Sequence, residues 1–165
     1  MSEFRRRASI GLGPGDTFTA TRAFDAEQVE AFARMTCDYN PIHFDAHFAR
    51  LKGFDGPICH GLLTGSLITL IGGQIAWLAS RIELTFLRPV PIGETVECSL
   101  TVLSVTEQRF ARAQARITNS RGEEVVRATL EGFLPSECER TRLAAMIAEG
   151  DPTNGLHGCS TFDET

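Results

Sequence analysis

The chain has 165 residues, 42% of them hydrophobic, which is enough for one sizeable core and too few for two ordinary domains. Its formal net charge of -5, with lysines and arginines scattered, argues against a nucleic-acid partner. Five cysteines form no CxxC pair, so neither a disulfide framework nor a structural zinc site is predicted. We therefore expect a cytoplasmic protein, and the N-terminus has no apolar run typical of a secretory signal.

The first elements lead toward one turn-rich segment. Residues 1–14 are predicted to form a flexible N-terminal arm. Alternating apolar residues and threonines in residues 16–23 predict a short strand. Asp25, with Gln28 three residues later, is typical of a capping box, and apolar residues at helical spacing follow it. This helix should deliver the chain to Asp38.

Asp38 and His43 form a candidate acid/base pair. On one continuous helix, residues five apart would point about 140° away from each other. Pro41 excludes such a helix because it has no N–H to donate, and it pushes Asn40 out of the helical region. The turn can therefore bring the carboxylate and the imidazole onto one water. The alternative is a solvated turn in which Asp38 and Asn40 bond only local backbone.

A long uncharged run follows this loop. Residues 37–57 are turn-rich, with one short helix predicted from about Asp45 to Lys52, and a long ordered loop of this kind is usually functional. Residues 61–80 contain no charged side chain, which raises a transmembrane helix as one interpretation. Glycines and hydroxyl side chains lower the apolarity of this run, so we expect a helix enclosed by protein and no membrane partner.

Four stretches after the uncharged run alternate apolar and polar residues, which predicts antiparallel strands with one buried face each. A turn is predicted at residues 119–122. The sequence thus predicts an α+β protein with a single hot-dog fold, a curved antiparallel sheet wrapped around a long central helix, in residues 15–135. Residues 136–165 are predicted to form a C-terminal tail, part helix (142–148) and part disordered. The four strand stretches are residues 81–86, 95–102, 111–117 and 126–132.

Three motifs in this order closely resemble those of the MaoC-like, R-specific enoyl-CoA hydratase (hydratase 2) family. They are Thr-Cys-Asp-Tyr-Asn-Pro-Ile-His at 36–43, Gly-Pro-Ile-Cys-His-Gly-Leu-Leu at 56–63 and Phe-Leu-Arg-Pro-Val-Pro-Ile-Gly-Glu-Thr at 86–95. The resemblance covers roughly residues 15–135. The sequence departs from the family pattern at Cys37, where a glycine usually precedes the aspartate. The resemblance therefore does not fix the backbone conformation just before Asp38.

The resemblance implies hydration of a trans-2-enoyl-CoA to an (R)-3-hydroxyacyl-CoA, or the reverse dehydration, without a metal or organic cofactor. Asp38 and His43 would hold a water between them, and which of the two accepts its proton stays open. Asn40 would orient the pair or hold the water, although an asparagine before proline can equally form the turn.

Gly61 is the candidate oxyanion donor, because the first amide of a helix has no intrahelical partner and lies at the positive end of the helix dipole. Ser66 and Thr69, spaced i and i+3, are candidates for substrate binding; their alternative is a hydroxyl bonded to the helix's own backbone. Arg88 is a candidate ligand for a CoA phosphate, with a solvated charge as its alternative. His60, next to Gly61, is predicted to be structural.

Other functions fit parts of the pattern. A 3-hydroxyacyl-carrier-protein dehydratase would use the same residues, and a non-catalytic acyl-thioester-binding subunit would need none of them. An acyl-thioester hydrolase commonly carries a carboxylate on the central helix, which residues 61–80 lack. We predict no metal, because the spacing of the potential ligands fits no standard site; these are His43, Asp45, His47, Cys59 and His60. An open sheet edge predicts a homodimer.

Overall fold

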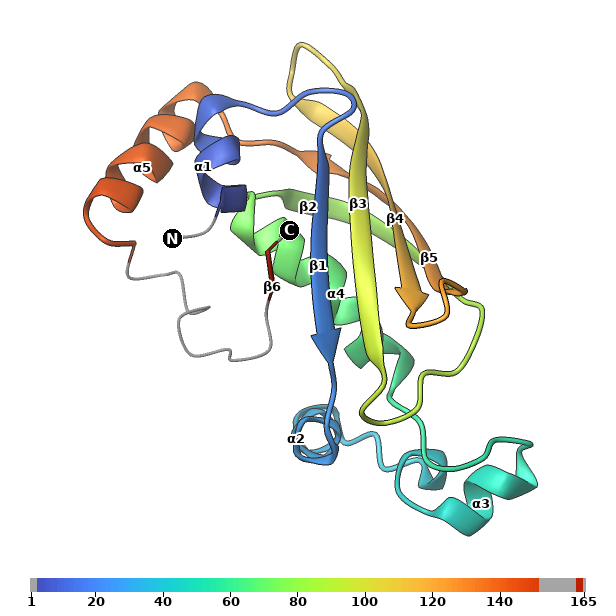
Figure 1. Cartoon of the computed structure of the whole chain (residues 1–165). Coiled ribbons are helices and arrows are strands. Elements are labelled where there is room, and N and C mark those ends of the chain that lie inside the picture. Colours follow the sequence, from blue (N-terminus) through green and yellow to red (C-terminus); the bar gives the residue numbers. More distant parts are fainter. Residues whose placement is uncertain (1–2, 152–162, 165) are drawn as a thin grey trace.

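A computed structural model describes residues 3–151 and 163–164 of the chain. In these residues one antiparallel sheet, with strand order β2-β5-β4-β3-β1-β6, curves around helix α4 (Figure 1). This is the predicted α+β hot-dog fold. The strands are β1 (Thr17–Ala23), β2 (Leu78–Phe86), β3 (Thr95–Val105), β4 (Phe110–Asn119), β5 (Glu124–Phe133) and β6 (Asp163–Glu164), and the helices are α1 (Glu3–Ile10), α2 (Ala26–Thr36), the 3-10 helix η1 (Pro41–His43), α3 (Ala46–Leu51), α4 (Gly61–Gln74) and α5 (Glu137–Ala148).

The core lies between the concave face of the sheet and α4. Alternate residues of β3, β4 and β5 are buried, as the sequence predicts, and pack in one cluster with Leu67, Ile68 and Ile71 of α4. Buried apolar side chains of this kind supply most of the folding free energy. The buried strand residues include Val96, Cys98, Leu100, Val102, Ala111, Ala113, Ala115, Ile117, Val126, Ala128 and Leu130.

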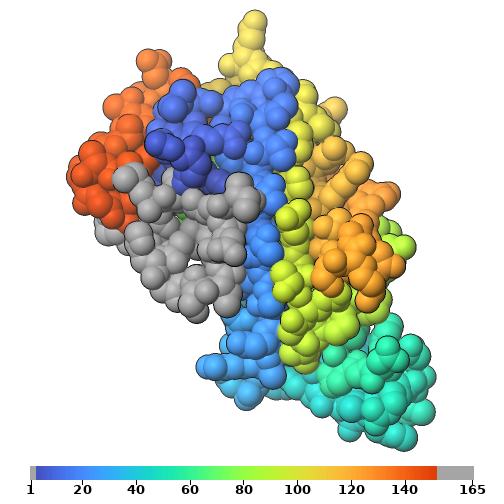
Figure 2. All heavy atoms as spheres, viewed as in Figure 1, coloured from blue at the N-terminus to red at the C-terminus, as the bar shows by residue number. Residues whose placement is uncertain are grey.

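Local signals set the boundaries of the elements near the site. Asp25 forms the predicted capping box with Gln28 at the start of α2. Asp45 accepts a hydrogen bond from the amide of Phe48 (2.6 Å) and so begins the predicted short helix, α3. Figure 2 shows the lobe that carries α3 projecting from the body of the molecule.

Strand β2 differs from the prediction. It lies at the edge of the sheet and is exposed on both faces, including Ile82 (41%) and Phe86 (51%), so the prediction of one buried face is wrong here. Alternation marks an apolar face, but an edge strand has no neighbour on one side to cover it. The uncharged run 61–80 is also divided, because α4 ends at Gln74 and β2 begins at Leu78. No helix among the described residues is long and apolar enough to span a bilayer.

The predicted flexible arm contains a packed helix, which corrects the prediction for residues 3–10. Phe4 and Ala8 of α1 are buried, and the Phe4 ring meets Phe18 of β1 edge to face with centroids 5.2 Å apart. A short segment rich in arginine gives no amphipathic signal strong enough to predict this. Helix α1 is therefore part of the core.

Arg5 fixes α1 to two other segments. Its guanidinium donates two hydrogen bonds to the carboxylate of Asp151 (2.9 and 2.8 Å), and both groups are buried. It also donates to the carbonyl oxygens of Gly73 (3.2 Å) and Gln74 (3.4 Å), where a cation is favourable beside the C-terminus of α4. One side chain thus joins α1, the end of α4 and the segment that follows α5.

The C-terminal tail is helical over a longer stretch than predicted. Helix α5 begins at Glu137 because Ser136 and Glu139 form a capping box that the sequence reasoning did not use. It packs beside α1 (Figure 1). The part of the tail predicted to be disordered falls mostly on residues 152–162, outside the described residues.

Candidate active site

The segment between α2 and η1 positions the predicted acid and base. Helix α2 ends at Thr36, and the next residue, Cys37, adopts the left-handed conformation (φ 58°, ψ 23°) and turns the chain into Asp38. Asn40 then caps η1, its side-chain oxygen accepting a hydrogen bond from the amide of Ile42 (3.3 Å). With Pro41 as the first residue of η1, the backbone turns between Asp38 and His43, as the sequence predicts.

Cys37 occupies a conformation that glycine adopts without strain. A residue with a Cβ pays about 1 kcal/mol there, so we expect Cys37→Gly to raise the free energy of unfolding by up to about 1 kcal/mol and to retain activity. Cys37→Ala keeps the Cβ and should give no such gain. Urea unfolding of the two variants tests this, and a Cys37→Gly protein less stable than Cys37→Ala would contradict it.

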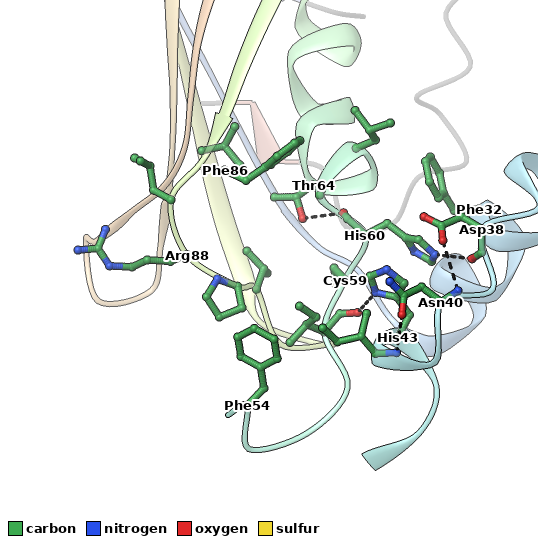
Figure 3. A pocket seen from close by; sticks show the side chains of 18 of the residues that line it. Phe32, Asp38, Asn40, His43, Phe54, Cys59, His60, Thr64, Phe86 and Arg88 are labelled. Carbon is green, nitrogen blue, oxygen red and sulfur yellow. Dashed lines mark hydrogen bonds between the residues drawn. The ribbon is translucent and has the colours of Figure 1, made fainter. Parts of the chain in front are cut away.

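The acid and the base come together in one cluster. A carboxylate oxygen of Asp38 and ring nitrogens of His43 and His60 all lie within 4.8 Å of one another (Figure 3). Two groups up to that distance apart can share one water at hydrogen-bond lengths of about 2.8 Å. Asp38 is exposed to the cavity whereas both histidines are buried, so one side of the cluster is wet and the other is dry.

Hydrogen bonding fixes the tautomer of His43. Its Nδ1 lies 2.8 Å from the carbonyl oxygen of Ile58, which can only accept, so Nδ1 carries the proton. The pKa of His43 lies below its usual 6.5, and burial of the imidazole is the largest cause. The positive charge of His60 lowers this pKa further, whereas the hydrogen bond to the Ile58 carbonyl and the carboxylate of Asp38 raise it in part. Neutral His43 therefore holds an unprotonated Nε2 at pH 7, as a general base requires.

The pKa of His43 can be tested directly. We expect NMR titration of the imidazole to give a pKa below 6.5 in the native protein. In Asp38→Asn it should fall further, because the carboxylate that favours the imidazolium is gone while burial remains. A pKa at or above 6.5 in the native protein would contradict this description of the site.

The two histidine rings of the cluster lie face to face. The rings of His43 and His60 are stacked, with centroids 3.8 Å apart and an interplanar angle of 28°. Imidazole lone pairs lie in the ring plane, so stacking of the two rings turns the lone pairs away from a common point. Of the other ligands considered from the sequence, Asp45 caps α3, and neither His47 nor Cys59 belongs to the cluster among the described residues.

Gly61 begins α4 at the edge of the same cluster. Its amide is the first of the helix and has no partner within it. A Cβ at this position would lie 2.8 Å from Cε1 of Phe86, so a larger residue would displace that ring. The helix start can thus approach a bound carbonyl closely at the positive end of the helix dipole.

These residues open into one cavity of about 780 Å³, a size usual for small-molecule sites. The polar cluster lies at one end, and Phe32, Phe54 and Phe86 contribute apolar surface (Figure 3). The full lining is Phe32, Thr36, Asp38, Asn40, Ile42, His43, Phe54, Ile58, Cys59, His60, Gly61, Leu62, Thr64, Phe86, Leu87, Arg88, Pro89, Val90 and Val126.

The predicted substrate-binding residues separate into two groups. Arg88 lines the cavity, where its Nη1 donates to the carbonyl oxygen of Glu124 (2.6 Å), and it is half exposed. Ser66 and Thr69 do not line the cavity, which corrects the prediction that they face it. Their hydroxyls donate to the carbonyl oxygens of Leu63 (2.6 Å) and Ser66 (2.8 Å) within α4, the alternative given above.

Sequence reasoning missed two groups that position the site. The Ile58 carbonyl orients His43, and Ile58 is itself held by a bridge to Pro91. Thr64 is buried against the cavity, with its hydroxyl donating to the carbonyl oxygen of His60 (3.3 Å). Ile58 belongs to the second motif, two residues before His60. Its place in that motif was the one sequence signal for a role in the site.

Comparison with known proteins shows the family of the chain. Residues 11–125 match the model of the MaoC like domain. The chain belongs to the MaoC-like family. The solved (R)-hydratase from A. caviae involved in PHA biosynthesis is 32% identical, with a TM-score of 0.71 over 75% of this chain and 98% of that one. The MaoC-like chain is also similar to R-hydratase PhaJ1 from Pseudomonas aeruginosa, with 28% identity and a TM-score of 0.72 over 78% of this chain and 86% of that one.

Curated relatives of the MaoC-like chain include both hydratases and dehydratases. It is 34% identical over 102 residues (59% of this chain, 76% of the relative) to the (R)-specific enoyl-CoA hydratase of Aeromonas caviae. It is 38% identical over 120 residues (70% and 75%) to the 3-hydroxybutyryl-CoA dehydratase of Methylorubrum extorquens. The mitochondrial 3-hydroxyacyl-[acyl-carrier-protein] dehydratase of Arabidopsis thaliana is 40% identical over 101 residues (59% and 60%).

Proposed function

We propose that this MaoC-like protein hydrates trans-2-enoyl-CoA to (R)-3-hydroxyacyl-CoA and catalyses the reverse dehydration. The observation that carries the proposal is the meeting of Asp38, His43 and the first amide of α4, at Gly61, in one acyl-sized cavity. The (R)-specific enoyl-CoA hydratase of Aeromonas caviae and the 3-hydroxybutyryl-CoA dehydratase of Methylorubrum extorquens, both similar to this chain, support the same reaction.

In the proposed hydration, neutral His43 is the base. Its Nε2 accepts one proton of the water while the carboxylate of Asp38 accepts a hydrogen bond from the other. The water oxygen bonds to C3, and the electron pair of the C2–C3 double bond moves to the thioester as an enolate. The amide of Gly61 donates a hydrogen bond to the enolate oxygen.

The proton on Nε2 of His43 then passes to C2, and the enolate collapses to the thioester carbonyl. Water has been added across one face of the double bond, and His43 is neutral again. We propose that this series of steps needs no metal or organic cofactor, since the proton moves only between water, His43 and carbon. Asn40 would hold the turn that keeps Asp38 and His43 on one water.

The substrate assignment follows from the cavity walls. The phenylalanines and Val126 suit an acyl chain, which needs apolar surface. Arg88, half exposed at the cavity, could pair with a phosphate of CoA. Its Nε also forms an ion pair with Oε1 of Glu123, 4.0 Å away. A carrier-protein thioester would enter the same cavity through its pantetheine arm.

The assay that tests the proposal uses crotonyl-CoA. We expect loss of the enoyl thioester, formation of (R)-3-hydroxybutyryl-CoA and no release of free thiol. Thiol release would indicate a hydrolase, and unchanged crotonyl-CoA with demonstrated binding would indicate an acyl-thioester-binding subunit. Crotonyl-carrier protein, compared at equal concentration, tests the carrier-protein dehydratase; a kcat/KM higher than that of crotonyl-CoA would overturn the choice of CoA.

We also propose a homodimer formed through edge strand β2. Leu78, Ile82 and Phe86 of β2 and Leu62 of α4 are large apolar side chains that stay exposed in the single chain. An unpaired edge with such side chains is a template for strand pairing. A second copy would cover both the strand and the adjacent side of α4.

Light scattering during size-exclusion chromatography tests the dimer. We expect the native protein to be dimeric and Ile82→Asp to be mostly monomeric, because the new charge would be buried at the interface. Leu103→Asp is the matched control, since Leu103 of β3 is similarly exposed (50%, against 41% for Ile82) but lies away from the edge. A native monomer, or equal dissociation of both variants, would contradict the proposal.

A cytosolic location is part of the same proposal. Cys37, Cys59, Cys98 and Cys138 are free thiols in the described part of the chain. Burial raises the pKa of Cys59 to about 11 and that of Cys98 to about 12, so both stay protonated and unreactive. Free thiols of this kind suit a reducing compartment.

A further inference from the structure

His60 makes contacts that its predicted structural role does not explain. It is 2% exposed, it stacks on His43, and it bonds the backbone of Asp38. We propose that His60 is a positioning residue that holds Asp38, His43 and Gly61 in one fixed arrangement for catalysis. This inference rests on the proposed hydratase function.

The first contact holds the acid. Nε2 of His60 lies 3.0 Å from the carbonyl oxygen of Asp38, so it must donate the hydrogen bond. The other bonds of Asp38 are longer and local: its amide donates to Oγ1 of Thr36 (3.4 Å), and its carboxylate accepts from the amide of Asn40 (3.3 Å). His60 therefore provides the bond that ties Asp38 to a distant part of the chain.

The second contact holds the base. The centroid of the His60 ring lies 3.8 Å from that of His43. The rings of Phe32 and Phe44 also contact the His60 ring, with centroids 5.0 and 6.1 Å from it. The Ile58 carbonyl already fixes one nitrogen of His43. A hydrogen bond at the edge and a ring against the face together leave the imidazole of His43 little freedom to tilt.

The third contact is covalent. His60 is the residue before Gly61, and its carbonyl oxygen accepts hydrogen bonds from the amide (3.0 Å) and hydroxyl (3.3 Å) of Thr64. A shift of His60 would therefore move the first amide of α4. Misplacement of reacting groups by about 1 Å can cost about a hundredfold in rate.

His60 acts through its neighbours and not on the substrate. Its Nδ1 is buried and has no hydrogen-bond partner, and its Nε2 is committed to Asp38. Neither nitrogen is available to exchange a proton with a bound thioester. This separates its role from those of Asp38 and His43.

Two substitutions divide the contacts. His60→Phe keeps a ring against His43 and removes the donor to Asp38, whereas His60→Gln keeps a donor at a similar reach and removes the ring. We expect His60→Phe to lower kcat for crotonyl-CoA by up to about 100-fold with KM changed less than about threefold. His60→Gln should retain more activity than His60→Phe. His47→Phe, on an exposed histidine of α3, is the matched control and should behave as the native protein.

NMR provides a readout that loss of stability alone would not change. Asp38 and His60 are the titratable groups whose charges act on His43. In His60→Gln the pKa of His43 should rise, because the charge that lowers it is removed. In the His60→Phe protein the amide resonance of Asp38 should shift. The thermal unfolding midpoints of the His60→Phe and His47→Phe proteins should both stay close to that of the native protein.

The outcomes are separable. A His60→Phe protein with native kcat would overturn the positioning role. The positioning role would also be overturned if His60→Phe and His60→Gln lost kcat equally, had lower thermal midpoints and left the resonances of Asp38 and His43 unchanged. That pattern would indicate a purely structural residue. A native protein without hydratase activity would overturn the proposed function, and the resonances of Asp38 and His43 would still decide whether His60 holds them.

Discussion

Asp38→Asn is expected to lower kcat for hydration of crotonyl-CoA by about a thousandfold, within the range typical for loss of an acid/base group. The amide is nearly isosteric, but it carries no charge and presents a donor to the water that the carboxylate would hold. The neutral imidazole of His43 would then remain as base beside a poorly oriented water. KM should change little, since the acyl chain binds elsewhere in the cavity.

The fold should survive this change. Asp38 is exposed, and an asparagine oxygen can still accept the hydrogen bond from the amide of Asn40. Asp45→Asn is the matched control, because asparagine caps a helix about as well as aspartate and α3 should stay intact. An Asp38→Asn protein with more than a tenth of native kcat would show that the carboxylate is not required.

The second large effect is expected on stability. Asp151→Asn should lower the free energy of unfolding by about 3 kcal/mol, because Arg5 loses the buried carboxylate that accepts two of its hydrogen bonds. Asparagine keeps the shape of the side chain and tolerates the positive φ of this position (43°). The carbonyl oxygens of Gly73 and Gln74 should limit the loss.

An exposed ion pair nearby provides the control for Asp151. Glu149 pairs with Arg142 at 3.1 Å, with both side chains more than half exposed. Glu149→Gln should change the free energy of unfolding by less than about 0.5 kcal/mol. Denaturant titration measures both variants, and equal effects would contradict a special role for the buried pair.

Local signals in the sequence were sufficient for most of the fold. The capping box at Asp25, the alternation in β3, β4 and β5, and the proline turn at Pro41 each depend on neighbours within a few residues. Such local preferences agree with one another here, and together with the resemblance to the MaoC-like family they predicted the hot-dog fold. Family motifs then placed Asp38 and His43 on that topology.

Long-range contacts account for what the sequence did not predict. The burial of Phe4 and Arg5 in α1 depends on β1, α4 and Asp151, which are distant in sequence. The exposure of β2 depends on its place at the sheet edge, which alternation does not encode. In the site, the stacking of His60 on His43 joins two motifs that a linear reading treats separately.

The central claim is that the imidazole of His43 takes one proton from the water and delivers it to C2, on the same face of the double bond that receives the hydroxyl. Hydration of crotonyl-CoA in D₂O, followed by determination of configuration at both carbons of the product, tests it most directly. We predict the (R)-3-hydroxy thioester carrying a single deuterium at C2, on the face that received the hydroxyl. An (S) product, deuterium on the opposite face, or a mixture of both faces at C2 would contradict the assignment of Asp38 and His43.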